Sequence, residues 1–229
     1  MFNFDFYNPT HIVFGKDRLG ELDTLVPKDA KVLITYGGGS AVRSGLIDRI
    51  VKALGNRKVE QFGGIEPNPS LETCERAVAF IKEHGVDFVL AVGGGSVVDA
   101  TKLIVMGATY NGPVIEVMKA GVPEVPVDMV PNPLPFGTVM TLPATGSEMN
   151  NGAVITYGDG KYPVFSSLVF PKFSMLDPTL TFTLPEKQVK NGVIDTFVHT
   201  TEQYLTYPVE GRIQDRFSEG ILKTMIEIG

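Results

Sequence analysis

The sequence contains a single cysteine, Cys74, so an internal disulfide cannot form. No signal peptide is predicted either, because the first residues have no basic stretch before an apolar one. Together these absences favour a reducing compartment, and we expect a cytoplasmic location. No apolar run approaches the roughly 18–20 residues that a membrane-spanning helix needs, so we expect no membrane partner.

Positive charge is also scarce. The chain has 20 lysines and arginines against 26 aspartates and glutamates, a net charge of −6, and its basic residues form no cluster. This balance argues against a nucleic acid or an anionic membrane as a partner. The 229 residues suffice for one large domain, or for one domain and part of another.

The most informative stretch lies between residues 87 and 102. Residues 88–92 are apolar without alternation, which is typical of a buried parallel strand. Three glycines follow, then Ser96 as the expected N-cap of a helix, with Asp99 in a capping-box-like position. A strand, a glycine loop and a helix in this order direct backbone N–H groups and the positive helix end at one point, where an anion can bind. The spacing differs from G-x-G-x-x-G, and a tight turn that binds nothing is the alternative.

The same arrangement occurs earlier in the chain. Residues 31–36 form a predicted strand that leads into a second Gly-Gly-Gly-Ser at 37–40, and a helix is expected from 44 to 54. Other predicted elements are strands at 58–62, 138–142 and 173–176 and a helix at 71–84. Strands that alternate with helices indicate βαβ units and a parallel sheet, which is an α/β fold.

Three other regions have weaker patterns. Residues 111–135 are rich in proline and are expected to form a long surface connection. Gly-Asp-Gly at 158–160, between two short strands, predicts a hairpin. A helix is expected to begin at Thr183, with no strand after it. We therefore predict two domains, an α/β domain at 1–182 and a helical one at 183–229.

A second candidate site lies in the predicted helix at residues 193–205. Asp195 and His199 are four residues apart, so their side chains share one helix face. A carboxylate and an imidazole at this spacing can bind one metal ion at adjacent positions. Such a site needs about three or four ligands, and neither His11 nor His84 lies in a convincing second ligand segment. The alternative is an Asp–His pair that only supports the helix.

Three segments together resemble one known family, the iron-containing (group III) alcohol dehydrogenases. Residues 93–102 (Gly-Gly-Gly-Ser-Val-Val-Asp-Ala-Thr-Lys) are similar to their G-G-G-S-x-x-D-x-x-K motif. Residues 141–148 (Thr-Leu-Pro-Ala-Thr-Gly-Ser-Glu) resemble their second loop, and residues 191–199 resemble the segment that holds their first two metal ligands. The start of the chain, including residues 36–40, most resembles the branch of NADPH-dependent butanol dehydrogenases and aldehyde reductases.

The resemblance implies a Rossmann-like parallel-sheet nucleotide-binding domain, followed by the start of an all-helical domain. It also implies a set of cofactor contacts. These are Gly93, Gly94, Gly95, Ser96 and Asp99 near the pyrophosphate, Thr141, Thr145 and Ser147 on the nicotinamide side, Lys161 at the ribose, Gly37, Gly38, Gly39 and Ser40 at the adenosine ribose, and Leu180 near the adenine or ribose.

The implied activity is hydride transfer between NADP(H) and a small aldehyde or alcohol. Relatives that prefer NAD(H) tend to place an aspartate in the loop at 37–40, whereas this chain has Gly39 there and Arg43 nearby, so NADP(H) is the expected cofactor. Asp195 and His199 would bind Fe²⁺ or Zn²⁺, which would polarise the substrate oxygen. A homodimer is expected by analogy with the family.

The chain departs from the family pattern at its end. The family continues into a longer helical domain with two further histidine ligands, whereas this sequence stops at Gly229. We therefore expect a truncated chain that binds cofactor weakly and reduces aldehydes negligibly. Its last predicted helix carries an apolar stripe that little remaining chain can cover, namely Ile213, Phe217, Ile221, Leu222, Met225 and Ile226.

Two other interpretations remain open. The chain could be a non-catalytic nucleotide-binding fragment, which would retain no metal ion through dialysis. It could also be a relative of glycerol dehydrogenase or of a sugar-phosphate lyase with the same architecture, which the match at 191–199 disfavours.

Overall fold

The computed structural model describes residues 3, 5–206 and 210–229. The chain divides into two compact units, Asn8–Thr181 and Phe182–Gly229, and the segment before Asn8 belongs with the second. The functional assignment of residues 1–182 and 183–229 as two domains stays a prediction.

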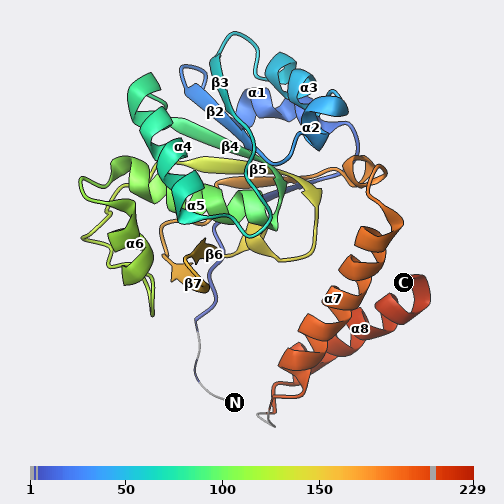
Figure 1. Ribbon diagram of the computed structural model, residues 1–229. Helices are drawn as coiled ribbons and strands as arrows, with labels where there is room; N and C mark the ends of the chain where they lie inside the picture. The colour runs from blue at the N-terminus through green and yellow to red at the C-terminus, as the bar shows by residue number, and fades with distance from the viewer. Residues whose placement is uncertain (1–2, 4, 207–209) are drawn as a thin grey trace. The chain divides into compact units, whose positions relative to one another are not determined.

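A six-stranded, fully parallel sheet forms the centre of the larger unit (Figure 1). Its strands follow the order β1-β8-β5-β4-β2-β3. Their bounds are His11–Phe14 (β1), Lys31–Tyr36 (β2), Lys58–Phe62 (β3), Phe88–Gly94 (β4), Phe136–Leu142 (β5) and Phe173–Leu176 (β8). The predicted α/β fold class is confirmed.

Helices cover both faces of this sheet, so alternate residues of each central strand enter different cores. In β4, Val89 and Ala91 face one core, whereas Phe88 and Leu90 face the other. The first core is completed by α4 (Leu71–His84), α5 (Gly95–Thr109) and α6 (Val114–Ala120). The second is completed by the short helix η1 (Arg18–Glu21) and by α1 (Leu22–Leu25), α2 (Ser40–Arg43) and α3 (Leu46–Ala53).

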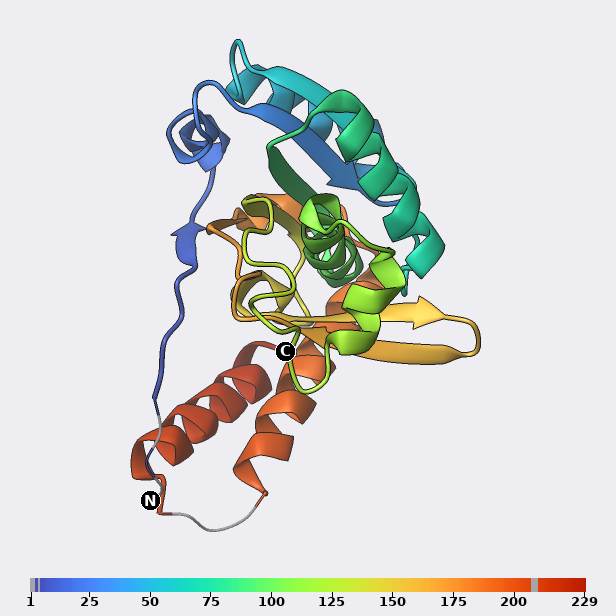
Figure 2. The same cartoon turned by 90° about the vertical axis from the view of Figure 1, so that its left-hand side faces the viewer.

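A separate antiparallel hairpin consists of β6 (Gly152–Tyr157) and β7 (Gly160–Phe165). Its turn contains the predicted Gly-Asp pair, with Gly158 at φ 55°. Figure 2 shows the hairpin extending from the body of this unit. The Thr156 amide donates a 2.8 Å hydrogen bond to the Pro69 carbonyl, which ties the hairpin to the loop before α4.

Several predicted boundaries were wrong. Helix α5 begins at Gly95, with Gly94 as its N-cap, so Ser96 lies inside the helix and caps nothing. Asp99 makes no capping box either, because its carboxylate binds groups of a distant segment. The proline-rich connection contains α6, because Val114, Val117 and Met118 recur at helical spacing and are buried.

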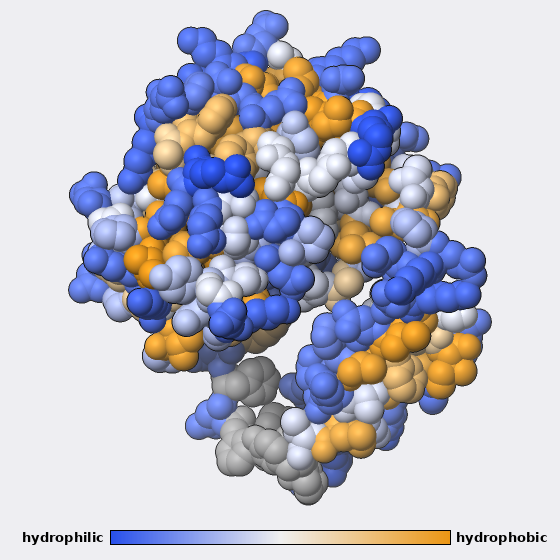
Figure 3. Space-filling model, in the orientation of Figure 1, coloured by the Kyte–Doolittle hydropathy of each residue, from blue (hydrophilic) through white to orange (hydrophobic). Residues whose placement is uncertain are grey.

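The helical unit contains α7 (Glu186–Tyr204) and α8 (Arg212–Ile228), and its described residues form no strand. Thr183 does not cap α7, which starts three residues later behind Pro185, whose φ of −58° already suits a helix. The predicted stripe on α8 is exposed at Ile213, Phe217, Ile221 and Ile226. Figure 3 shows apolar surface on these two helices. Across the described part of the chain, no helix combines the length and apolar composition needed to cross a membrane.

Gly137 of β5 allows the buried Phe173 ring to lie against the backbone. A Cβ at Gly137 would lie 2.3–2.7 Å from three atoms of that ring. The ring is 1% exposed and stacks on Phe88, so it has little room to move. We expect Gly137→Ala to lower the free energy of unfolding by about 2–3 kcal/mol in urea titrations.

The matched test pairs Gly137→Ala with Phe173→Leu. The leucine removes ring atoms that the new methyl group would overlap, so the double variant should lose less stability than the two single losses combined. Additive losses would show that the ring does not limit this position.

Candidate functional site

The candidate site lies at the carboxyl edge of β2, β4 and β5, which are neighbours in the sheet. Tyr36 pairs with Val92, and Gly94 pairs with Leu142, so the three strands end side by side. The predicted segments 37–40, 93–96 and 141–148 lie at these strand ends. The glycine loop predicted at 93–96 is absent, because β4 runs to Gly94 and α5 begins at Gly95. Ligands of open parallel sheets bind at this edge. The topology therefore brings the two Gly-Gly-Gly-Ser segments and the Thr/Ser segment together.

The start of α5 packs tightly against the loop that follows β5. A Cβ at Gly95 would lie 2.2 Å from Thr145 Oγ1 and 2.6 Å from Thr145 Cγ2. Only glycine allows this approach without displacement of one of the two segments. The first-turn N–H groups of α5 have no partners within the helix, and an anion can satisfy them.

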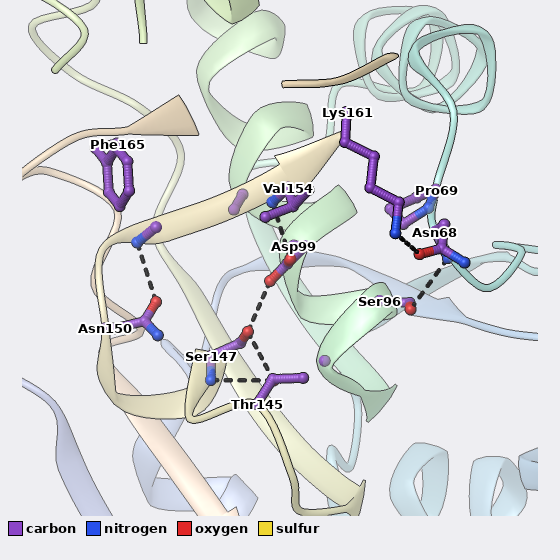
Figure 4. A pocket seen from close by; sticks show the side chains of 13 residues that line it. Asn68, Pro69, Ser96, Asp99, Thr145, Ser147, Asn150, Val154, Lys161 and Phe165 are labelled. Carbon is purple, nitrogen blue, oxygen red and sulfur yellow. Dashed lines mark hydrogen bonds between the residues drawn. The ribbon is translucent and has the colours of Figure 1, made fainter. Parts of the chain in front are cut away.

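A cleft of about 380 Å³ opens beside this helix start (Figure 4). It is lined by three parts of the chain, the loop before α4, the start of α5, and the segment from the β5 loop through the hairpin. The lining residues are Asn68, Pro69, Gly95, Ser96, Asp99, Thr145, Ser147, Asn150, Gly152, Ala153, Val154, Lys161 and Phe165.

Asp99 is the centre of a hydrogen-bond chain on the wall of the cleft. Thr145 Oγ1 donates to Ser147 Oγ over 2.9 Å, and Ser147 Oγ donates to Asp99 Oδ1 over 2.7 Å. The second carboxylate oxygen accepts the Val154 amide at 2.9 Å. Burial raises the pKa of Asp99 above its usual range, while these hydrogen bonds and the Lys102 charge favour the ionised form. Asp99 thus connects α5 to the loop and to the hairpin.

A second set of contacts crosses the opposite end of the cleft. Lys161 Nζ on β7 donates to Asn68 Oδ1 over 2.8 Å, and the backbone N–H of Asn68 donates to Ser96 Oγ over 3.4 Å (Figure 4). Asn68 has φ 56°, a left-handed conformation that asparagine tolerates better than most residues. These contacts hold the hairpin and the loop before α4 beside the helix start.

The structure brings together six of the predicted cofactor residues on the cleft lining, namely Gly95, Ser96, Asp99, Thr145, Ser147 and Lys161. Gly93 and Gly94 lie at the end of β4, and Thr141 lies at the end of β5. The loop Gly37, Gly38, Gly39 and Ser40 follows β2 at the same edge, and Gly38 faces open space, because a Cβ placed there would have no atom within 4 Å. Leu180 is half-buried and packs against the second core, and its predicted cofactor contact stays a prediction.

Sequence reasoning missed the other residues of the lining, namely Asn68, Pro69, Asn150, Gly152, Ala153, Val154 and Phe165. Asn68 had a usable signal, because the Pro-Asn-Pro at 67–69 follows β3, another strand of the same parallel sheet. Asn150 and the hairpin had none, because a hairpin pattern does not say which loop it covers.

Asp195 and His199 lie on one face of α7, with Asp195 Oδ1 3.7 Å from His199 Nε2. Both side chains are close to half exposed, so an ion could reach them. Their chemistry suits Fe²⁺ or Zn²⁺. However, the described residues contain no group of three or more potential ligands, and a catalytic metal site takes at least three. The pair therefore has suitable ligand types for such a metal, but two ligands are too few for a catalytic metal site.

Known proteins resemble the chain over its whole length. The family model described as "Iron-containing alcohol dehydrogenase" matches residues 9–178. The chain is 51% identical over 234 residues to NADPH-dependent aldehyde reductase YqhD of Escherichia coli (strain K12), a match that covers 100% of this chain and 59% of that protein. It is 45% identical to probable NADH-dependent butanol dehydrogenase 1 of Bacillus subtilis (strain 168), with 99% and 58% covered.

The fold has a similar solved counterpart. The crystal structure of YqhD from E. coli K-12 superposes with a TM-score of 0.92 at 49% sequence identity, and the match covers 98% of this chain and 57% of that one. The chain therefore spans less than two thirds of the length of these relatives.

Proposed function

Because the chain belongs to the iron-containing alcohol dehydrogenase family, we propose that it binds NADP(H) in the cleft and takes part in hydride transfer to or from a small aldehyde or alcohol. The observation that carries the proposal is the cleft itself, at the carboxyl edge of a parallel sheet, beside the helix start that Gly95 allows against Thr145. A pyrophosphate matches unpaired N–H groups at such a helix start.

The chain's own residues would bind and orient the cofactor. The start of α5, at Gly95 and Ser96, would hold the pyrophosphate. Thr145 and Ser147 would face the nicotinamide side, with Ser147 oriented by Asp99. Lys161 would contact the ribose, and the walls of the cleft would exclude water from the reacting carbon.

A metal ion is a further part of the proposal. Asp195 and His199 would supply two ligands to Fe²⁺ or Zn²⁺, and the remaining ligands would come from outside the described residues. When bound, such an ion polarises the oxygen of a carbonyl substrate as a Lewis acid. The homodimer expected by analogy stays a prediction.

The direct test is NADPH consumption by the purified protein with its full set of metal ligands, with short aldehydes added in the presence and absence of a chelator. Aldehyde-dependent, chelator-sensitive oxidation supports the proposal. Binding of NADPH without turnover would favour the second candidate, a non-catalytic nucleotide-binding module, because the same cleft serves both. Absence of NADP(H) and NAD(H) binding would contradict the proposal.

Cofactor preference should depend on Gly39. This glycine has φ 92°, and a Cβ there would lie 3.3 Å from Arg43 Nη1. In Gly39→Asp, the new carboxylate would pair with Arg43 and repel a 2′-phosphate, so the preference for NADPH over NADH should fall roughly tenfold or more. The ratio of the two dissociation constants measures this.

The matched control is Gly39→Asn, which has the same shape and backbone demand but no charge. Both variants carry the same strain from the left-handed conformation, and each ratio compares two cofactors on one protein. An equal change of this ratio in the two variants, or no change in the aspartate variant, would show that charge at residue 39 does not determine the cofactor preference.

A further inference from the structure

Lys102 of α5 is a charged side chain buried in the larger unit. It is 0% exposed, and its ammonium reaches the segment that lines the cleft. Lys102 Nζ lies 2.7 Å from Asn150 Oδ1 and 2.7 Å from the Gly152 carbonyl oxygen. Lysine is rarely buried without partners, because the desolvation of its charge is costly. Its two acceptors both belong to residues of the cleft lining.

These acceptors form a compact node at the start of β6. Asn150 Oδ1 also accepts the Gly152 amide at 3.0 Å, so one oxygen fixes the turn and receives the ammonium. The shared oxygen therefore sets the path of the chain between the β5 loop and the hairpin.

Asp99 holds the same segment from one turn earlier on α5. Asp99 accepts N–H and O–H donors from Val154 and Ser147, whereas Lys102 donates to acceptors at Asn150 and Gly152. Residues three apart on a helix share a face, so the two opposite charges bind one stretch of chain at successive points. The carboxylate takes the donors and the ammonium takes the acceptors.

Lys102 is also the positive charge among two carboxylates at this place. Asp99 and Glu148 both act on it electrostatically. Glu148 Oε2 is buried, and no donor from the described residues reaches it. Without the ammonium, the negative charges of Asp99, which lines the cleft, and of Glu148 would oppose the binding of an anionic pyrophosphate there.

We propose that Lys102 is a positioning residue for the cofactor site, which holds the Asn150–Gly152 wall and neutralises the carboxylates of Asp99 and Glu148 so that an anionic dinucleotide can bind. This inference rests on the proposed function, since it assumes that the dinucleotide occupies this cleft. It adds a proton-dependent contact to the site.

The charge of Lys102 changes within an accessible pH range. Burial lowers its pKa to about 8, against the opposing effect of Asp99 and Glu148. A neutral amine could still donate to Asn150 and Gly152, but it would leave both carboxylates without a counter-charge. Affinity for NADPH should therefore be complete below pH 8 and fall as the pH rises through it.

The test is NADPH titration of the purified protein between pH 7 and 9.5. Binding is followed by the fluorescence of the nicotinamide, because the chain has no tryptophan whose fluorescence could report it. The dissociation constant of the natural sequence should rise roughly tenfold over this range. Lys102→Met, of similar length but uncharged, should bind about tenfold more weakly at pH 7 and show no step near pH 8. Lys102→Arg, which stays charged, should restore binding at pH 9.5 relative to Lys102→Met.

The controls separate the possible failures. Lys52→Met removes an exposed lysine of α3 and should keep the natural pH profile. If Lys102→Met does not fold, Asn150→Ala replaces it, and unchanged affinity in that variant overturns the proposal. A flat profile in the natural sequence, or the same step in Lys102→Met, also overturns it while NADPH binding itself stands. If the natural sequence binds no NADP(H) at all, the proposed function fails first.

Discussion

Gly95→Ala is expected to weaken NADP(H) binding roughly a hundredfold, because displacements near 1 Å at a binding site have effects of that size. The new methyl group would lie 2.2 Å from Thr145 Oγ1, far inside contact distance. Thr145 cannot simply rotate away without loss of its hydrogen bond to Ser147. Either α5 or the loop must shift, and both carry the proposed phosphate and nicotinamide contacts. NADPH fluorescence titration measures the loss.

The effect on binding should exceed the effect on folding. Alanine is intrinsically about 1 kcal/mol better than glycine within a helix, which offsets part of the strain. Gly20→Ala is the control, because that position has no atom within 4 Å of a new Cβ and lies away from the cleft. Wild-type affinity in Gly95→Ala would show that the close approach to Thr145 is not needed for the cofactor.

The sheet and its glycine loops were predictable because their signals are local. Residues 88–92 are apolar on both faces, since helices cover both sides of the strand. The glycines after it mark the point where the chain turns into α5. Parallel strands then place all such strand ends at one edge, so residues 37–40, 93–96 and 141–148 could be grouped without a structure.

The remaining parts of the site depend on long-range contacts. Lysine is usually a surface residue. The burial of Lys102 is explained only by the approach of Asn150 and Gly152, about fifty residues later in the chain. Asp99 was expected to cap its own helix, but donors from Ser147 and Val154 outcompete that local role. A side chain's partner across the fold cannot be read from periodicity.

The prediction from proline content also failed at residues 111–135, where packing against the core stabilises a helix. The prolines of residues 111–135 suggested an irregular connection, yet α6 forms there because three apolar side chains reach the core. Tertiary burial can stabilise a helix of seven residues that would not form alone.

In the protein with its full set of metal ligands, His199→Ala is expected to remove the bound metal and to lower turnover by at least about a hundredfold, while the dissociation constant for NADPH changes less than about threefold. Loss of residues that only orient a metal ligand costs about 10–100-fold, so loss of a ligand itself should cost at least as much. His199 is close to half exposed, so its truncation leaves no buried cavity and should barely affect stability. Metal analysis after dialysis, together with aldehyde reduction, provides the measurement.

Asp195→Ala should have the same effect, and the double variant should be no worse than either single one. Ligands of one ion act as a unit, so their effects on turnover are not additive. Glu186→Ala, an exposed acidic residue on another face of the same helix, is the matched control and should change neither metal content nor turnover. The competing interpretation is a pair that only supports α7, and it predicts the reverse pattern. Under it, both variants would keep full activity and lose a few tenths of a kcal/mol of stability.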